Sequence, residues 1–182
     1  MRLGIAHHFG WAVAVTATDE HGVADRRRIE LVGEGVAAAP VHGRDSAALG
    51  DEDLAALVAE VRASAWRTAG AELDRLAAAL PGPIESISLR AWPPDFPTDV
   101  AVLRRPPYEA QADSVMYREV LAELAHARGW EIHLFDAATV GSEAAALLGE
   151  RAERVLRGPR QALGPPWNKD HRIALAATVL AA

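Results

Sequence analysis

The chain has 182 residues, of which 50% are hydrophobic and 24% are charged, and its formal net charge is −6. This apolar content supports a packed core, which excludes a disordered chain, and no apolar run approaches the ~20 residues that span a bilayer, which excludes a transmembrane protein. The absence of cysteine excludes disulfides, thiolate metal sites and cysteine nucleophiles. We expect one domain over residues 1–182 and a cytoplasmic location, because the first residues lack the apolar stretch and cleavage site of a signal peptide.

The composition is typical of GC-rich coding, because alanine and arginine dominate it. The chain contains 39 alanines, and 18 of its 19 basic residues are arginine. Its single lysine, Lys169, directly follows its single asparagine, Asn168. A composition that disfavours both residue types elsewhere marks this segment as a candidate functional site.

The first third of the chain has the pattern of an antiparallel meander. Short apolar or alternating runs over residues 3–6, 11–17 and 23–32 predict three strands. The segment 19–22 ends in glycine and predicts a hairpin turn between the second and third strands. Residues 33–50 carry glycine, proline and acidic residues without a period and predict a loop.

The middle of the chain alternates helix and strand. Leucines and other apolar residues at helical spacing predict a helix over 51–80, which the Pro-Gly-Pro sequence ends. A strand is expected over 84–91 and a second helix over 114–128. Between them lies a long proline-rich connection over 92–113, in which residues 100–103 could form a short strand.

The last third continues the alternation. Gly129 is placed to end the second helix in the left-handed conformation, and residues 131–135 predict a strand. A helix capped by Ser142 is expected over 142–157, and a final apolar helix over 170–182. A helix between two strands implies a right-handed parallel crossover, so we expect the strands 84–91 and 131–135 to be parallel to the first strand.

This element order resembles that of the ribonuclease H-like superfamily. Residues 3–5 followed by a turn and residues 10–15 are similar to the first hairpin of the Holliday-junction-resolvase-like branch, and residues 169–176 resemble the acidic start of its last helix. The resemblance implies an α/β fold with a five-stranded mixed sheet, a central first strand and helices on both faces. It also implies phosphodiester hydrolysis and a nucleic-acid substrate.

One position departs from that family. Its nucleases carry an aspartate at the end of the first strand, where it bridges two metal ions, whereas this chain has Ala6. Alanine offers no ligand atom, so we expect no tight Mg²⁺ site and no conventional nuclease activity. Two alternatives stay open: a member without catalysis, or a rebuilt site. A rebuilt site would hold a single divalent ion on Asp136, Asp170 and one histidine, and the nitrogen ligand would favour Mn²⁺ or Zn²⁺.

Two histidines follow Ala6 at the exit of the first strand. Neighbouring residues on a strand point to opposite faces, so His7 and His8 are not expected to bind one metal together. His8 is a candidate catalytic residue and His7 a candidate substrate-binding residue. The alternative for both is a turn residue with local hydrogen bonds.

The ends of two later strands carry polar candidates. Asp136 follows the strand 131–135, which we expect next to the first two strands, and could bind a metal or act as a general base. The alternative is a turn residue that leads into a helix. Arg90 could hold a phosphate or carboxylate by a bidentate pair, or it could pair with a surface acid.

The segment around the single lysine supplies the remaining candidates. Lys169 could neutralise an anion, Asp170 could bind a metal or accept a proton, and His171 could act as acid or base near neutral pH. Trp167 is a candidate for contacting substrate. These residues surround a helix N-terminus, which favours anions. The alternative is capping by Asn168, with Asp170 in the first turn.

Three function classes are compatible with these observations. The first is a divergent nuclease or nucleic-acid-binding protein, the second a catalytically inactive protein-interaction module, and the third a binder of a small anion such as a phosphate or nucleotide. The basic clusters 26–28 and 104–105 could form a local nucleic-acid surface or a solvated face. No P-loop, dinucleotide-binding, HExxH or GxSxG motif is present, which argues against those enzyme classes.

Overall fold

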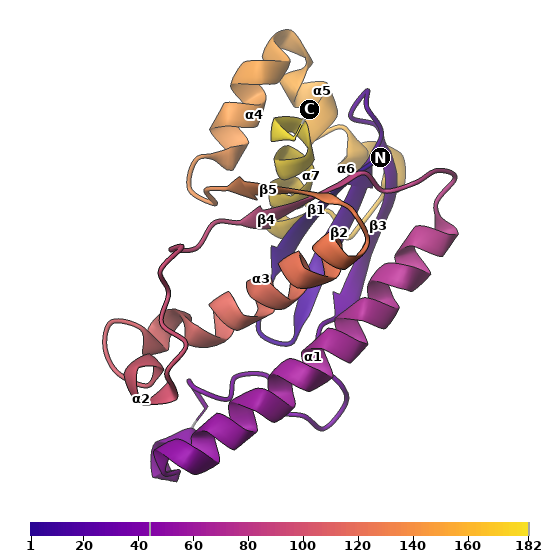
Figure 1. Cartoon of the computed structure of the whole chain (residues 1–182). Coiled ribbons are helices and arrows are strands. Elements are labelled where there is room, and N and C mark those ends of the chain that lie inside the picture. The colour runs from indigo at the N-terminus through magenta and orange to yellow at the C-terminus, as the bar shows by residue number, and fades with distance from the viewer. Residues whose placement is uncertain (44, 182) are drawn as a thin grey trace.

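The computed structural model describes residues 1–43 and 45–181. Within these residues the chain forms an α/β fold whose five strands make one mixed sheet in the order β3-β2-β1-β4-β5 (Figure 1). The strands are β1 (Arg2–His7), β2 (Trp11–Ala17), β3 (Val23–Glu30), β4 (Ser86–Arg90) and β5 (Glu131–Phe135). The helices are α1 (Asp51–Ala79), α2 (Val100–Leu103), α3 (Glu109–Ala127), α4 (Val140–Leu148), α5 (Ala152–Leu156), α6 (Pro159–Leu163) and α7 (Lys169–Leu180), with short 3-10 turns η1 (Asp45–Ala48) and η2 (Gly149–Arg151).

Strand pairing confirms the predicted sheet. β1 lies at its centre, antiparallel to β2 with Ile5 opposite Ala14, and parallel to β4 with Leu3 opposite Ile87. β2 pairs antiparallel with β3, and β4 pairs parallel with β5. The carboxyl ends of β1, β4 and β5 therefore meet at one end of the sheet.

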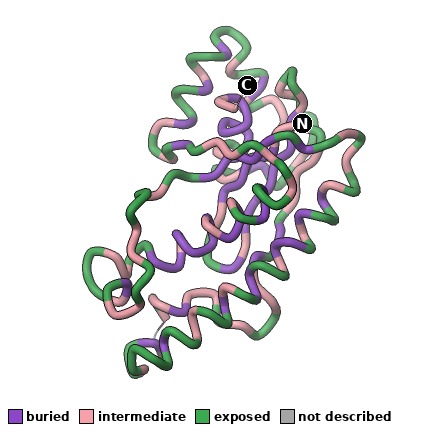
Figure 2. Tube along the Cα trace, viewed as in Figure 1, coloured by how far each residue is buried: buried purple, intermediate pink, exposed green. Residues whose placement is uncertain are grey.

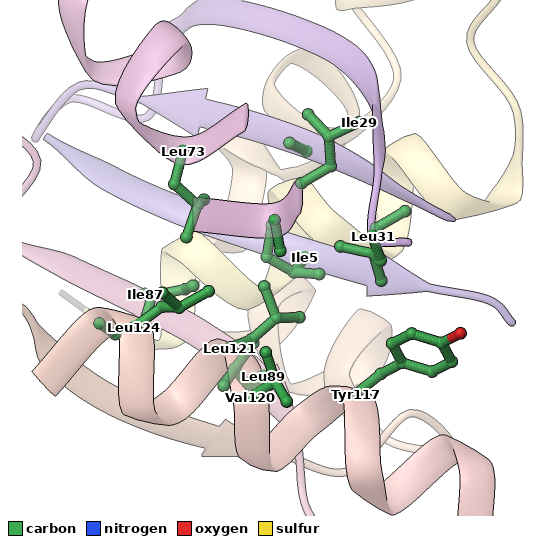
Figure 3. Packing of buried hydrophobic residues seen from close by; sticks show 14 of the residues in the cluster. Ile5, Ile29, Leu31, Leu73, Ile87, Leu89, Tyr117, Val120, Leu121 and Leu124 are labelled. Atoms are coloured by element: carbon green, nitrogen blue, oxygen red, sulfur yellow. The ribbon is translucent and has the colours of Figure 1, made fainter. Parts of the chain in front are cut away.

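Helices cover both faces of the sheet, as predicted. Leu3 and Ile5 of β1 point into a core that α1 and α3 close, and Figure 3 shows Leu73 of α1 and Leu121 of α3 against this face. Alternate residues of β1 point the other way, where Ala6 packs with Ala174 of α7. In Figure 2 the buried residues follow the strands and the inner faces of these helices.

α7 lies directly on β1 because Gly4 has no side chain. A Cβ atom on Gly4 would lie 1.9 Å from the carbonyl oxygen of Ala174, closer than any contact between these atoms can be. This close approach fixes α7 against the central strand. The start of α7 then lies beside the carboxyl end of β1, where Asp170 contacts His8.

Several predicted boundaries differ from the structure. Residues 100–103 form a helix rather than a strand, because the Asp99 side chain caps it by accepting a hydrogen bond from the Ala101 amide at 2.9 Å. α3 begins five residues earlier than predicted. β3 ends two residues earlier than the predicted strand 23–32. β4 begins two residues later and ends one residue earlier than the predicted strand 84–91. Residue 44 of the predicted loop and residue 182 of the predicted last helix lie outside the described residues.

The helix predicted over 142–157 is interrupted. Gly149 has a φ of +53° and ends α4, after which the chain continues as η2 and α5. Ser142 is not the cap but lies inside α4, where its hydroxyl donates to the Thr139 carbonyl at 2.8 Å. Gly129 has a φ of +71° at the end of α3, as predicted. None of the helices described here is both long and apolar enough to cross a bilayer.

Candidate functional site

Five of the predicted site residues line one cavity at the carboxyl ends of β1 and β4. This cavity, here called the strand-end pocket, has a volume of about 280 Å³. Its lining includes His7, His8, Arg90, Lys169 and Asp170, together with Ala6. Segments that are far apart in the sequence therefore meet where ligands gather in open α/β sheets.

His8 and Asp170 form a contact across the mouth of this pocket. Nε2 of His8 lies 3.2 Å from Oδ2 of Asp170, and the imidazole stacks on the Trp11 indole with ring centroids 4.1 Å apart. The carboxylate and the indole hold the ring in one orientation. A histidine positioned by a carboxylate can transfer protons during a reaction.

His7 points toward α3 instead of α7, as strand alternation predicts. Its Nε2 lies 3.2 Å from the Ser114 hydroxyl oxygen. Burial, together with the positive charges of Arg118 and Arg90, lowers the pKa of His7 to about 3. His7 is therefore neutral near pH 7.

Arg118 is a functional candidate that sequence reasoning missed. The residue is 3% exposed, and its guanidinium donates to the carbonyl oxygens of Ser114 at 2.9 Å and Ala91 at 2.7 Å. Burial and the neighbouring charge of Arg90 lower the pKa of Arg118 to about 10, so it stays charged near pH 7. A signal was present, because Arg118 lies three residues before the buried Leu121, on the apolar face of its helix.

The two cations that line the pocket, Arg90 and Lys169, and the nearby buried Arg118 lack carboxylate partners among the described residues. Arg90, Arg118 and Lys169 form no ion pair with any residue that the structure describes. Asp170 is the one acidic side chain among the described residues that line the strand-end pocket. The two lining cations therefore outnumber the lining carboxylate, and this excess of positive charge favours a bound anion.

The prediction for Asp136 is wrong in its geometry. β5 is an edge strand that β4 separates from β1, so Asp136 does not lie beside the first two strands. Its Oδ1 accepts a hydrogen bond from the Ala138 amide at 2.8 Å, which is the turn that leads into α4. Asp136 lines a neighbouring cavity together with Arg90 and Trp92.

His171 and Trp167 have structural contacts and do not line the strand-end pocket. Asn168 caps α7 by accepting hydrogen bonds from the Asp170 and His171 amides at 3.0 and 3.2 Å, and Nδ1 of His171 lies 2.7 Å from the same Asn168 oxygen. Burial, with a smaller effect of Arg26, lowers the pKa of His171. Trp167 is 6% exposed, and its indole N–H donates to the Leu156 carbonyl at 3.3 Å.

The predicted ligands of a single metal ion do not come together. Among the residues that the structure describes, no three histidine, aspartate or glutamate side chains lie close enough to hold an ion. The structure therefore gives no support to a set of Asp136, Asp170 and one histidine, and the Asp136 carboxylate instead accepts from the Ala138 amide in its own turn.

The basic cluster on β3 is occupied by internal contacts. Arg26 donates to the carbonyl oxygens of Leu163 and Gly164, at 2.8 and 2.9 Å. Arg27 pairs with Asp25 at 2.8 Å. Arg28 pairs with Glu30, also at 2.8 Å, and lies over the Trp11 ring. These contacts favour a structural role for the cluster.

Two further cavities continue the strand-end pocket. One of about 300 Å³ shares Arg90 with it and adds Trp92, and one of about 380 Å³ shares Lys169 and adds Arg157 and Arg172. We call the three cavities together the strand-end groove. A ligand longer than a single phosphate could lie along it.

No protein-family model matches the chain, and no curated protein matches its sequence. The function is therefore argued from the geometry of the strand-end groove.

The lowered pKa of His7 predicts a pH dependence of stability. The unfolded chain takes up a proton on this ring below pH 6.5, whereas the folded chain resists it down to about pH 3. The stabilisation is therefore fully present above pH 6.5 and is lost as the pH falls from 6.5 to about 3. Urea unfolding should show that the wild type loses free energy of unfolding, on the order of 3 kcal/mol from this ring, as the pH falls through this range. His7→Gln should lack that loss, because glutamine does not titrate. Equal slopes in the variant and the wild type would contradict this prediction.

Proposed function

We propose that the chain is a ribonuclease H-like protein that binds the phosphate groups of a single nucleic-acid strand along the strand-end groove. The strand order β3-β2-β1-β4-β5, with an antiparallel meander followed by parallel strands, supports the fold assignment. In an RNase H-like fold, the carboxyl end of the central strand is where the resemblance places the substrate.

The observation that carries this proposal is the excess of cations at the strand-end pocket. Arg90 and Lys169 bring two positive charges to a lining whose one described carboxylate is Asp170, and the buried Arg118 adds a third positive charge close to His7. The N-terminus of α7 adds the partial positive charge of its helix dipole. A phosphate would supply the negative charge that these groups lack.

The shape of the groove favours a strand over an isolated phosphate. Arg90 and Lys169 each line two of the adjoining cavities, and Arg172 lines the far one, so cations occur along its length. Trp92 at the other end offers an aromatic ring for stacking a base. The −6 net charge of the whole chain restricts this attraction to the groove.

The groove supports binding more strongly than two-metal hydrolysis. Ala6 lies in the lining at the position where a first-strand aspartate would face the substrate. A second candidate function is histidine-assisted hydrolysis of a phosphodiester, and the contact between His8 and Asp170 favours it. In that reaction His8 would take a proton from the water whose oxygen bonds to phosphorus, the P–O bond to the leaving group would break, and the leaving oxygen would take a proton from solvent. Asp170 would stabilise the charged ring.

Fluorescence anisotropy with a labelled oligothymidylate of about ten nucleotides tests the binding proposal. We expect saturable binding whose affinity falls with salt, with a logarithmic slope of about −2 for three phosphate contacts. Arg67→Gln serves as a matched control, because Arg67 is exposed on α1, far from the groove. No binding at low salt, or a slope near zero, would contradict the proposal. Equal affinity for thymidine monophosphate would point to a nucleotide binder instead.

A further inference from the structure

A second cavity lies at the opposite end of the sheet. It has a volume of about 730 Å³ and is formed between the turn joining β2 to β3 and the short helices α5 and α6, and we call it the turn cavity. Ala17, at the end of β2, is opposite Arg2, at the start of β1, so this turn lies away from the strand-end groove. Its volume falls within the range of small-molecule sites.

The polar side of the turn cavity is positively charged. Arg151 donates to the Glu20 carbonyl oxygen at 3.3 Å. Among the described residues, neither Arg151 nor Arg154 forms an ion pair. Burial, together with Arg2 and Arg151, lowers the pKa of His21, so its ring is neutral near pH 7. The two arginines and Glu20, the acidic residue of the described lining, together carry one positive charge. This net charge matches a monoanion.

Apolar side chains also line the turn cavity. Val23, Val155 and Leu163 line it, and Leu163 is 43% exposed. A ligand with an apolar body would remove this surface from water. A cavity lined by both cationic and apolar side chains suits an amphipathic anion.

Polar atoms beside the cavity also lack partners. Nδ1 of His21 and Nη1 of Arg2 are buried without a hydrogen-bond partner among the described residues. Buried polar atoms are rarely left unpaired, so both atoms are unusual features beside this cavity.

We propose that the turn cavity binds a small amphipathic carboxylate, with its head group on Arg151 and Arg154 and its apolar tail on Val155 and Leu163. Two guanidinium groups suit a carboxylate, because their parallel N–H donors match its two oxygens. The site is separate from the strand-end groove, so it adds a ligand to the proposed function and does not depend on it.

Isothermal titration calorimetry with octanoate tests this proposal on the full chain. We expect one octanoate per chain, and we expect Arg154→Gln to weaken binding about 10-fold. Octanamide has the same tail and no charge. The wild-type chain should bind octanamide no more tightly than Arg154→Gln binds octanoate. Leu163→Ser should also weaken octanoate binding, because it removes an apolar side chain from the lining.

Two control variants make the outcome decisive. Arg160→Gln changes an exposed arginine on α6 that does not line the turn cavity, and Arg90→Gln changes the strand-end groove, so both should leave octanoate affinity unchanged. Absence of octanoate binding, equal affinity for octanamide, or equal losses in Arg154→Gln and Arg160→Gln would each overturn the proposal. Loss of octanoate binding in Arg90→Gln would also overturn it, because the carboxylate would then occupy the groove.

Discussion

Replacing Gly4 by alanine is expected to lower the free energy of unfolding by about 3 kcal/mol. The added Cβ would lie 1.9 Å from the Ala174 carbonyl oxygen, so α7 must move away from β1. Both are rigid elements in the centre of the fold, and the neighbouring atom is backbone, which cannot rotate aside. The displacement would also carry Lys169 and Asp170 out of the strand-end pocket.

Urea unfolding followed by circular dichroism measures this effect. Gly141→Ala is the matched control, because a Cβ at Gly141 in α4 would meet no atom within 4 Å. Alanine at that helical position should raise stability by up to about 1 kcal/mol. If Gly4→Ala were as stable as Gly141→Ala, the close packing of α7 on β1 would be wrong.

Replacing both Arg90 and Lys169 by glutamine should weaken oligothymidylate binding about 100-fold at low salt. Each charge is expected to contribute about a factor of ten through its phosphate contact, and the two losses should add. Both side chains are exposed and unpaired within the described residues, so the free energy of unfolding should change by less than about 0.5 kcal/mol.

The control for this double variant is the exposed Arg67 on α1. Arg67→Gln removes the same kind of charge from a distant surface, so it should leave binding nearly unchanged. A double variant that binds as tightly as Arg67→Gln would place the nucleic acid elsewhere. A double variant that binds weakly and is also unstable would be explained by unfolding, which the urea measurement detects.

The arrangement of the sheet could be predicted because it depends on short-range patterns. Residues 3–6 and 11–17 are apolar runs that fit strands, and the helices 51–80 and 114–128 have periodic apolar faces. The rule for right-handed crossovers then made the later strands parallel to the first. The order of the parallel strands depends on which helix covers which face of the sheet, and sequence pattern does not reveal this. The prediction that the strand 131–135 lies next to the first two strands is therefore wrong, because β4 separates β5 from β1.

The site could be predicted only in part, for different physical reasons at each residue. His8 and Asp170 are close because α7 packs on β1, and that contact depends on Gly4, whose role sequence pattern does not reveal. Arg118 has a sequence signal in its position on the apolar face of its helix, but in an arginine-rich chain that signal is weak until the burial of the residue is known. Of the two rare neighbours, Asn168 is a helix cap, whereas Lys169 lies exposed in the groove lining.

Nuclear magnetic resonance of the histidine rings tests the central claim most directly, because His7 and His8 lie in the strand-end pocket. When the oligothymidylate is added, the ring signals of both should shift. The pKa of His7 should rise, because a bound phosphate offsets the charges of Arg118 and Arg90, while the neighbouring His8 and the Ser114 hydroxyl stay in place. His126 is exposed on α3 and should keep its signal. Shifts at His126 or at His21 with none at His7 and His8 would contradict a phosphate site at the carboxyl ends of β1 and β4.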